Sequence, residues 1–212
     1  MDNSRTTIVV VDYGMGNLGS IMNMLKKVGA KAVRSSSASD VDRAGKLILP
    51  GVGAFDAGMR SLSDLGLVTV LNRRVIEGKT PILGICLGMQ LLARGSEEGE
   101  LPGLGWLDAE VLKFRFNGIR DKGLKVPHMG WNTVEVTGES RLFNNMGPDP
   151  RFYFVHSYHV CCNNEENVLA RTFHGHEFVS AVKRENIVGV QFHPEKSHKF
   201  GMKLLSNFVR LA

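Results

Sequence analysis

The chain has 212 residues, of which 43% are apolar and 22% are charged, a composition typical of globular proteins that fold in water. Its net charge of +5 comes from scattered Lys and Arg residues without a long basic run, which disfavours a nucleic-acid-binding protein. No apolar run reaches the roughly 20 residues that a membrane span requires, and the N-terminus lacks a secretory pattern. The three cysteines, Cys86, Cys161 and Cys162, suit neither a disulfide framework nor a zinc motif. We therefore expect a cytoplasmic protein that binds no metal, membrane or nucleic acid.

Strands and helices are expected to alternate through the first half of the chain. Residues 6–11 are a β-branched run, as in a strand buried on both faces of a parallel sheet, and residues 18–28 carry apolar side chains at helical spacing. The alternation continues with strands at 31–34, 46–49 and 81–85 and helices at 55–62 and 67–77. This order predicts a doubly wound α/β sheet, in which functional residues lie at the carboxyl ends of the strands.

The pattern changes after residue 93, where the helical period disappears. A loop at 96–105 is followed by β-rich segments and by one final helix at 200–211. The expected strands are residues 109–116, 131–136, 151–156, 168–173, 178–182 and 187–191. They predict an antiparallel or mixed extension of the same sheet. We therefore expect residues 1–212 to form a single-domain, doubly wound mixed α/β sheet with flanking helices, because no linker or repeat interrupts them.

Residues 84–88 form a G-x-C-x-G pattern between an expected strand and a helix-like segment. A strand-to-helix turn of this kind holds a nucleophile in a strained backbone, with a glycine on each side where a side chain would clash. Amides at the start of the following helix can lower a thiol pKa and bind a developing oxyanion. The pattern predicts that Cys86 is a nucleophile, although it also fits a buried cysteine at the end of a core strand.

A cysteine nucleophile needs a base, and the base needs a carboxylate that orients it. His193 and Glu195 follow the expected strand at 187–191, so they lie at the same sheet edge as Cys86. A lone His-x-Glu pair is more often a surface pair. Together with the strand-to-helix turn at residues 84–88, which we call the elbow, it nevertheless predicts a triad of Cys86, His193 and Glu195.

The turn at residues 50–53, Pro-Gly-Val-Gly, follows a neighbouring strand and can bring a backbone amide to the nucleophile. We expect the amides of Val52 and Leu87 to form an oxyanion hole, in which loss of one donor typically costs about 10²–10³ in rate. The glycines on either side of Val52 would permit its amide to rotate inward, so the hole need not be preformed. The same turn also fits a plain connection with no chemical role.

In combination, the elbow, the His-Pro-Glu segment and the Pro-Gly-Val-Gly turn resemble the class I glutamine amidotransferases, and the resemblance covers the whole chain. Further segments resemble, in order and spacing, the branch of that family that supplies ammonia to the cyclase of imidazole glycerol phosphate synthase in histidine biosynthesis. These segments are DYGMGNLGS, LPGVGAFDAGM, GICLGMQLL, SEEG with the following GLGW, KVPHMGWN, YFVHSYH and VGVQFHPEKS. The resemblance implies a flavodoxin-like core and a glutaminase reaction without a cofactor, in which Cys86 attacks the side-chain amide of glutamine and ammonia is released.

The resemblance also implies roles for further residues. Those that would hold the glutamine substrate are Gly51, Gly53, Gln90, His156, Ser157 and Tyr158. The partner would be a cyclase subunit with a (β/α)₈ barrel, bound as a heterodimer through Asn17, Trp131, Tyr153 and Lys196. Ammonia would pass directly to that partner, because free ammonia is mostly protonated in neutral water and is then no longer nucleophilic.

Residues 197–201 resemble paralogous amidotransferase subunits that deliver ammonia for amino-sugar or amidino-sugar synthesis in surface polysaccharides. That role is an alternative to the histidine pathway and leaves the glutaminase chemistry unchanged. A non-enzymatic scaffold is disfavoured because all three triad residues are present. The histidine pairs at 156/159 and 174/176 lack an acidic or cysteine cluster, so they do not predict a metal site.

Overall fold

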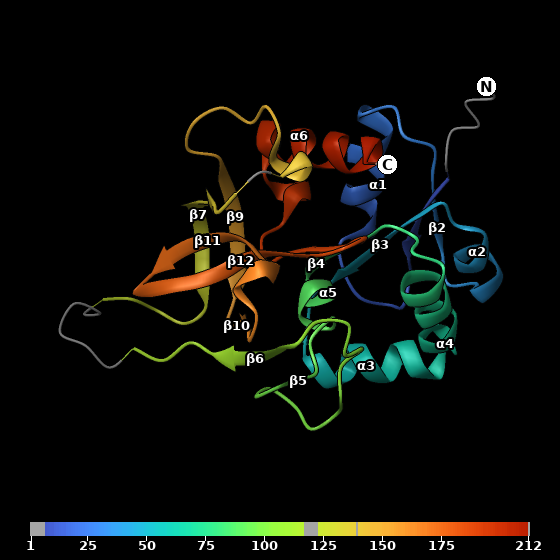
Figure 1. The fold of residues 1–212 in the computed structure, drawn as a ribbon, viewed down its shortest axis with the longest axis horizontal. Helices are drawn as coiled ribbons and strands as arrows, with labels where there is room; N and C mark the ends of the chain where they lie inside the picture. The colour runs from blue at the N-terminus through green and yellow to red at the C-terminus, as the bar shows by residue number, and fades with distance from the viewer. Residues whose placement is uncertain (1–6, 117–122, 139, 212) are drawn as a thin grey trace.

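The computed structural model describes residues 7–116, 123–138 and 140–211. At its centre lies a parallel sheet with the strand order β2-β1-β3-β4-β13 (Figure 1). These strands are β1 (Ile8–Val11), β2 (Ala32–Ser35), β3 (Lys46–Gly51), β4 (Ile82–Cys86) and β13 (Ile187–Val190). The chain passes from β1 to β2 on one side and then crosses to β3 on the other. The predicted doubly wound core is therefore confirmed.

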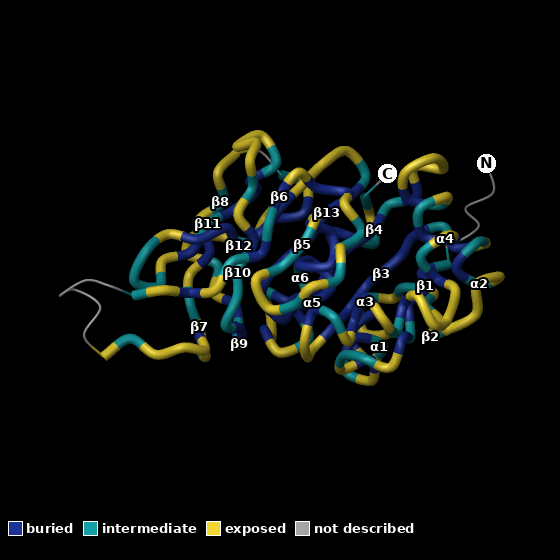
Figure 2. The backbone as a smooth tube through the Cα atoms, turned by 90° about the horizontal axis from the view of Figure 1, so that it is seen from below, coloured by how far each residue is buried: buried dark blue, intermediate teal, exposed yellow. Residues whose placement is uncertain are grey.

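Helices cover both faces of this sheet (Figure 1). One face carries α1 (Leu18–Lys27) and α6 (His198–Arg210), and the other carries α2 (Ala38–Arg43), α3 (Phe55–Asp64) and α4 (Leu67–Asn72). Alternate side chains of β1 face opposite helical layers: Ile8 packs with α1 and α6, whereas Val9 packs with the helices on the other face. The central strands are buried on both faces, as the dark tube in Figure 2 shows, which explains their continuous apolar sequences.

Beyond β13 the strands pair antiparallel except for the last pair, β5 and β6, which is parallel, in keeping with the antiparallel or mixed extension that the sequence predicts. It continues through β12 (His176–Arg184), β10 (Tyr158–Cys162), β6 (Ala109–Lys113) and β5 (Gly95–Ser96). A side branch is formed by β11 (Val168–His174), which pairs with β12, and by β8 (Glu135–Val136). Within the described residues eleven strands thus join one mixed sheet, while β7 (His128–Thr133) and β9 (Arg151–His156) form a separate antiparallel pair.

Several elements differ from the expectations. The strand expected at 131–136 is divided between β7, which begins at His128, and β8, and the helix expected at 67–77 continues beyond α4 as a π-helical turn, Arg73–Glu77. The sequence does not predict α2 or β10, because each buries a single side chain, Val41 and Val160, and so lacks a clear apolar period. Short 3-10 turns occur at Arg141–Phe143, Glu165–Asn167 and Pro194–Lys196.

The first strand begins at Ile8, and Thr6, which belongs to the predicted run, lies outside the described residues. Among the residues that the structure describes, none of the helices has the length and apolar character needed to cross a bilayer.

Candidate active site

The carboxyl ends of β3, β4 and β13 meet at one edge of the sheet, where functional residues are predicted. Gly51 at the end of β3 lies opposite Cys86 at the end of β4. Gln191, Phe192 and His193 follow β13 directly. Three segments that are far apart in the sequence, the glycine-rich turn, the predicted nucleophile and the predicted base, therefore come together.

Cys86 occupies the sharp turn that the G-x-C-x-G pattern predicts. Its backbone has φ 53° and ψ −110°, a strained conformation for a residue with a side chain. A Cβ on Gly84 would lie 2.7 Å from the carbonyl oxygen of Gly88, and a Cβ on Gly88 would lie 1.8 Å from that of Leu49. Close backbone approach therefore explains both glycines. The helix-like segment that follows is α5 (Leu87–Gln90), a helix of four residues.

His193 and Glu195 form a buried pair beside this turn. The Nδ1–H of His193 donates to Oε1 of Glu195 at 2.8 Å, and the two side chains are 1% and 2% exposed. The backbone N–H of His193 donates to the Tyr153 carbonyl at 2.9 Å, and the Ser197 hydroxyl donates to the His193 carbonyl at 2.6 Å. Nε2 has no hydrogen-bond partner among the described residues, so it remains available to a reacting group.

The Cys86 thiol influences the charge of His193 although no ordinary hydrogen bond joins Nε2 to the sulfur. Burial alone would lower the pKa of His193, but interactions with Cys86 and with the Glu195 carboxylate outweigh burial and raise the pKa to about 10. The imidazole therefore holds its proton at neutral pH. A protonated imidazole next to a thiol favours the thiolate, which is the nucleophilic form.

Cys86 faces a cavity of about 310 Å³. Eight of the predicted residues line it: Val52, Gly53, Cys86, Leu87, Gln90, His156, Ser157 and Tyr158. Gly51 is predicted to hold substrate but does not line the cavity, because it is a buried strand residue on which a Cβ would lie 2.5 Å from the Tyr13 hydroxyl.

Three other lining residues are not predicted from the sequence: Glu98, Pro127 and Val155. Glu98 is the one carboxylate among the described residues that line the cavity, and its Oε2 accepts from the backbone N–H of Phe55 at 2.9 Å. The sequence feature that could have pointed to Glu98 is the acidic Ser-Glu-Glu-Gly segment at residues 96–99, which closely follows the elbow.

Tyr13 holds the first residue of the Pro-Gly-Val-Gly turn in place. Its buried hydroxyl donates to the Pro50 carbonyl at 2.6 Å. Burial, with a smaller contribution from Cys86, raises the pKa of Tyr13 above its ordinary value, so the hydroxyl keeps its proton and remains a donor. Val52 is 42% exposed and lines the cavity. The turn is thus fixed at one end and accessible at the other, and the oxyanion roles of Val52 and Leu87 stay predictions.

Most residues predicted for a partner interface gather on the surface near His193. Trp131 is 41% exposed, packs edge-on against Tyr153 with ring centroids 6.2 Å apart, and stacks on His198 at 5.3 Å. The Nζ atom of Lys196 lies 5.5 Å from the centroid of the Tyr153 ring. Asn17 caps α1, which packs against the turn that carries Lys196. His198 is the member of this cluster that the sequence does not predict.

Five histidines gather around the ring of Phe114: His128, His156, His159, His174 and His176. His128 Nδ1 lies 3.0 Å from His156 Nε2, and the His128 ring stacks on that of His174 at 4.2 Å. Burial is the main cause that lowers the pKa of His128 and of His159 to about 4 and that of His156 well below 6.5. In the described part of the chain, no three His, Cys, Asp or Glu side chains are arranged to hold a metal.

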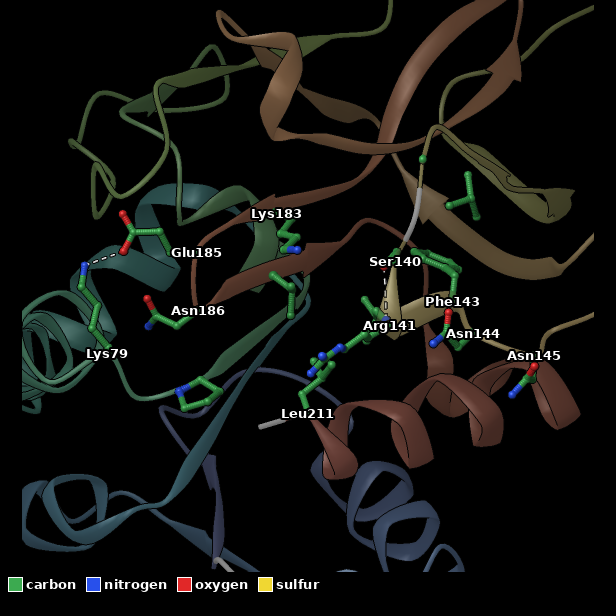
Figure 3. Close-up of a pocket in the computed structure, with 15 residues that line it drawn as sticks. Lys79, Ser140, Arg141, Phe143, Asn144, Asn145, Lys183, Glu185, Asn186 and Leu211 are labelled. Atoms are coloured by element: carbon green, nitrogen blue, oxygen red, sulfur yellow. Dashed lines mark hydrogen bonds and ion pairs between the residues drawn. The ribbon is translucent and has the colours of Figure 1, made fainter.

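A more spacious cavity, of about 1010 Å³, lies at the opposite edge of the sheet, where β4 and β13 begin (Figure 3). In this cavity Lys79 pairs with Glu185 at 2.7 Å, while Arg141 and Lys183 reach toward the open space from other elements. None of the predicted site residues is among the described residues that line it. Size alone therefore does not identify the functional site.

Comparisons with known proteins identify the family of the chain. The family model described as glutamine amidotransferase class-I matches residues 9–212. A relative from Methanococcus maripaludis, called imidazole glycerol phosphate synthase subunit HisH 2, is 52% identical over 205 residues, which cover 97% of this chain and 100% of the relative. A protein of the same name from Pseudomonas aeruginosa is also 52% identical, over 204 residues that cover 96% of this chain and 99% of the relative.

Solved structures share the fold at lower identity. The crystal structure of a glutamine amidotransferase matches with a TM-score of 0.69 at 21% identity, covering 93% of this chain and 98% of that one. PurLQS from Thermotoga maritima matches with a TM-score of 0.70 at 18% identity, covering 96% and 97%. Since the family model spans almost all of the sequence around the elbow and the His-Glu pair, this chain belongs to the class I glutamine amidotransferase family.

Proposed function

We propose that this chain is the glutaminase subunit of an imidazole glycerol phosphate synthase, which releases ammonia from glutamine for the cyclase of histidine biosynthesis. The observation that carries the proposal is the position of Cys86, on a strained elbow, facing a cavity and beside the buried pair of His193 and Glu195. The two relatives at 52% identity match over essentially their whole length and carry the name of that subunit, which supports the pathway.

In the first half of the reaction, the Cys86 thiolate attacks the side-chain carbonyl carbon of glutamine and forms a C–S bond. The amides of Val52 and Leu87 donate to the resulting oxyanion. Protonated His193 gives its Nε2 proton to the departing nitrogen as the C–N bond breaks. Ammonia leaves, and a glutamyl thioester remains on Cys86.

In the second half, neutral His193 takes a proton from a water molecule whose oxygen attacks the thioester. The C–S bond then breaks, glutamate is released, and the thiolate and protonated imidazole are restored. Glu195 holds Nδ1 of His193 throughout, because its 2.8 Å bond leaves Nε2 free to exchange protons in both halves.

The cavity offers complementary groups to the amino-acid end of glutamine. We assign the carboxylate of Glu98 to the α-ammonium group, since it lines the cavity and is oriented by the Phe55 N–H. The polar groups of Gln90, Ser157 and Tyr158 lie around the same space and suit the remaining polar atoms of the substrate. This arrangement would place the side-chain amide of glutamine next to Cys86.

We assign the surface formed by Asn17, Trp131, Tyr153 and Lys196 to a cyclase subunit with a (β/α)₈ barrel. Trp131 is 41% exposed and its neighbour in β7, Met129, is 62% exposed, and interfaces are enriched in both residue types. The backbone bond between the His193 N–H and the Tyr153 carbonyl joins this surface to the catalytic edge. A partner docked there would cover the route by which ammonia leaves, so ammonia would reach the cyclase before it is protonated.

The test combines the chain with a histidine-pathway cyclase subunit, the phosphorylated ribulosyl-aminoimidazole-carboxamide substrate and glutamine, and measures imidazole glycerol phosphate. We expect product with the wild-type chain, and none with Cys86→Ala unless ammonium salt replaces glutamine. Trp131→Ala should weaken binding of the cyclase by at least about tenfold, because exposed tryptophans at interfaces often dominate affinity. Glutamine-dependent product with Cys86→Ala would overturn the nucleophile assignment. No product with the cyclase, but ammonia transfer to a sugar-modifying partner, would assign the chain to the paralogous pathway.

A further inference from the structure

A buried amide lies beside the nucleophile and contacts Gln90, a residue that lines the glutamine cavity. Gln191 is 0% exposed and follows the last residue of β13. Its Nε2 lies 3.7 Å from Sγ of Cys86, and its Oε1 lies 3.1 Å from Nε2 of Gln90. A polar side chain at such depth is unfavourable unless its donors and acceptors are paired, so these contacts explain how the amide is tolerated. The triad and the oxyanion hole do not require it.

The surrounding hydrogen bonds decide which end of the Gln191 amide faces the sulfur. Nε2 of Gln90 also donates to the carbonyl oxygen of Tyr158 at 3.1 Å, and a carbonyl oxygen can only accept. The amino end of Gln90 is therefore fixed on that side. This amino group meets Gln191 as well, so the facing atom of Gln191 is its oxygen. The amino group of Gln191 then points at Cys86 as a donor.

A hydrogen bond from an N–H group favours the ionised form of its acceptor over the neutral form. We propose that Gln191 is a further residue of the nucleophile's site, which stabilises the Cys86 thiolate and positions its sulfur through one donated hydrogen bond. The donor approaches from the end of β13 and is oriented by Tyr158 and Gln90, which line the glutamine cavity. The inference rests on the nucleophilic role proposed above for Cys86.

The test measures the rate at which iodoacetamide alkylates Cys86 in the isolated chain as a function of pH. Peptide mass spectrometry resolves the sites, because Cys161 is exposed and Cys162 is partly exposed. Gln191→Met keeps the length of the side chain but removes the donor. We expect the pH of half-maximal alkylation at Cys86 to rise by about one unit, a roughly tenfold loss of thiolate at a given pH, while Cys161 is unaffected. Gln191→Asn, whose amide is too short to reach the sulfur, should shift the profile in the same direction and provides a second variant if Gln191→Met does not fold.

Asn207→Leu is the matched control. Asn207 is another buried amide, and its Nδ2 donates to the carbonyl oxygens of Leu142 and Asn144 at 2.9 Å, away from the site. This substitution should lower the melting temperature and leave the Cys86 profile unchanged. An unchanged profile in a folded Gln191 variant, or an equal shift in Asn207→Leu, would overturn the inference. Failure of the wild type to use glutamine with its partner would defeat the proposed function instead, and the alkylation profiles would still decide the role of Gln191.

Discussion

The Nδ1–H of His193 donates to Oε1 of Glu195 at 2.8 Å in a site where both side chains are almost completely buried. This bond places a proton on Nδ1 and leaves Nε2 free for the proton exchange with a reacting group that we propose for it. Burial would lower the pKa of His193, but Cys86 and Glu195 together raise it to about 10. The orientation and the charge of the base therefore both depend on Glu195.

Glu195→Gln should lower kcat for glutamine hydrolysis by roughly 10⁴, the size of effect seen when a triad carboxylate becomes a carboxamide. The carboxamide can turn an N–H toward Nδ1, which moves the proton of the neutral ring to Nε2 and prevents that atom from acting as a base. The measurement is steady-state glutamate production in the partner complex, with the melting temperature as a check on folding. A kcat within tenfold of the wild type would contradict the role of Glu195.

Glu98→Gln should raise KM for glutamine by about tenfold and leave kcat nearly unchanged, since a charge that holds the substrate equally in the ground and transition states affects binding alone. The amide keeps an oxygen for the Phe55 N–H, so the loop should retain its position. Glu100→Gln, in the same exposed loop but outside the cavity, is the matched control. Equal KM values for Glu98→Gln and Glu100→Gln would show that Glu98 does not hold the ammonium group.

The triad and the core can be predicted from the sequence because each depends on local patterns. The glycines around Cys86 determine a sharp turn, and the apolar run before Gln191 predicts a buried strand that ends near His193. A doubly wound sheet then brings these strand ends to one edge without any knowledge of distant contacts. The structure shows all three parts at that edge.

Glu98, Gln191 and the histidine cluster cannot be predicted in this way because their neighbours are set by long-range pairing. His128 meets His156 because β7 pairs with β9 in a register that places these two residues opposite each other. Gln191 meets Gln90 because β13 lies beside β4. The register of distant strands is decided by packing in the folded chain, and no short motif encodes it.

Gly88→Ala should destabilise the fold by about 3 kcal/mol or more, because the new Cβ would lie 1.8 Å from the carbonyl oxygen of Leu49 and the backbone of β3 would have to move. Gly19→Ala is the matched control. Gly19 lies in α1 with open space around its Cβ position, so alanine there should increase stability by about 0.5–1 kcal/mol. Urea unfolding compares the two variants, and similar effects of the two substitutions would refute the close-approach explanation of the elbow.

The histidine cluster should make the protein lose stability as the pH falls below about 6.5. Burial first, and His174 second, lower the pKa of His128 from 6.5 to about 4. Between these two values the unfolded chain takes up a proton that the folded protein does not bind, so the free energy of unfolding decreases with falling pH. The gap for His128 corresponds to a loss of about 3 kcal/mol once the pH has reached about 4.

His128→Gln should therefore reduce the slope of unfolding free energy against pH between about pH 6.5 and 5, a window above the titration of most carboxylates. His193 opposes that slope only weakly: with its pKa raised to about 10 the folded protein holds the proton throughout the window, while the unfolded chain is half protonated near pH 6.5 and almost fully protonated near pH 5. Urea unfolding at closely spaced pH values measures the slopes, and a wild-type slope in His128→Gln would show that this ring is not held neutral by the fold.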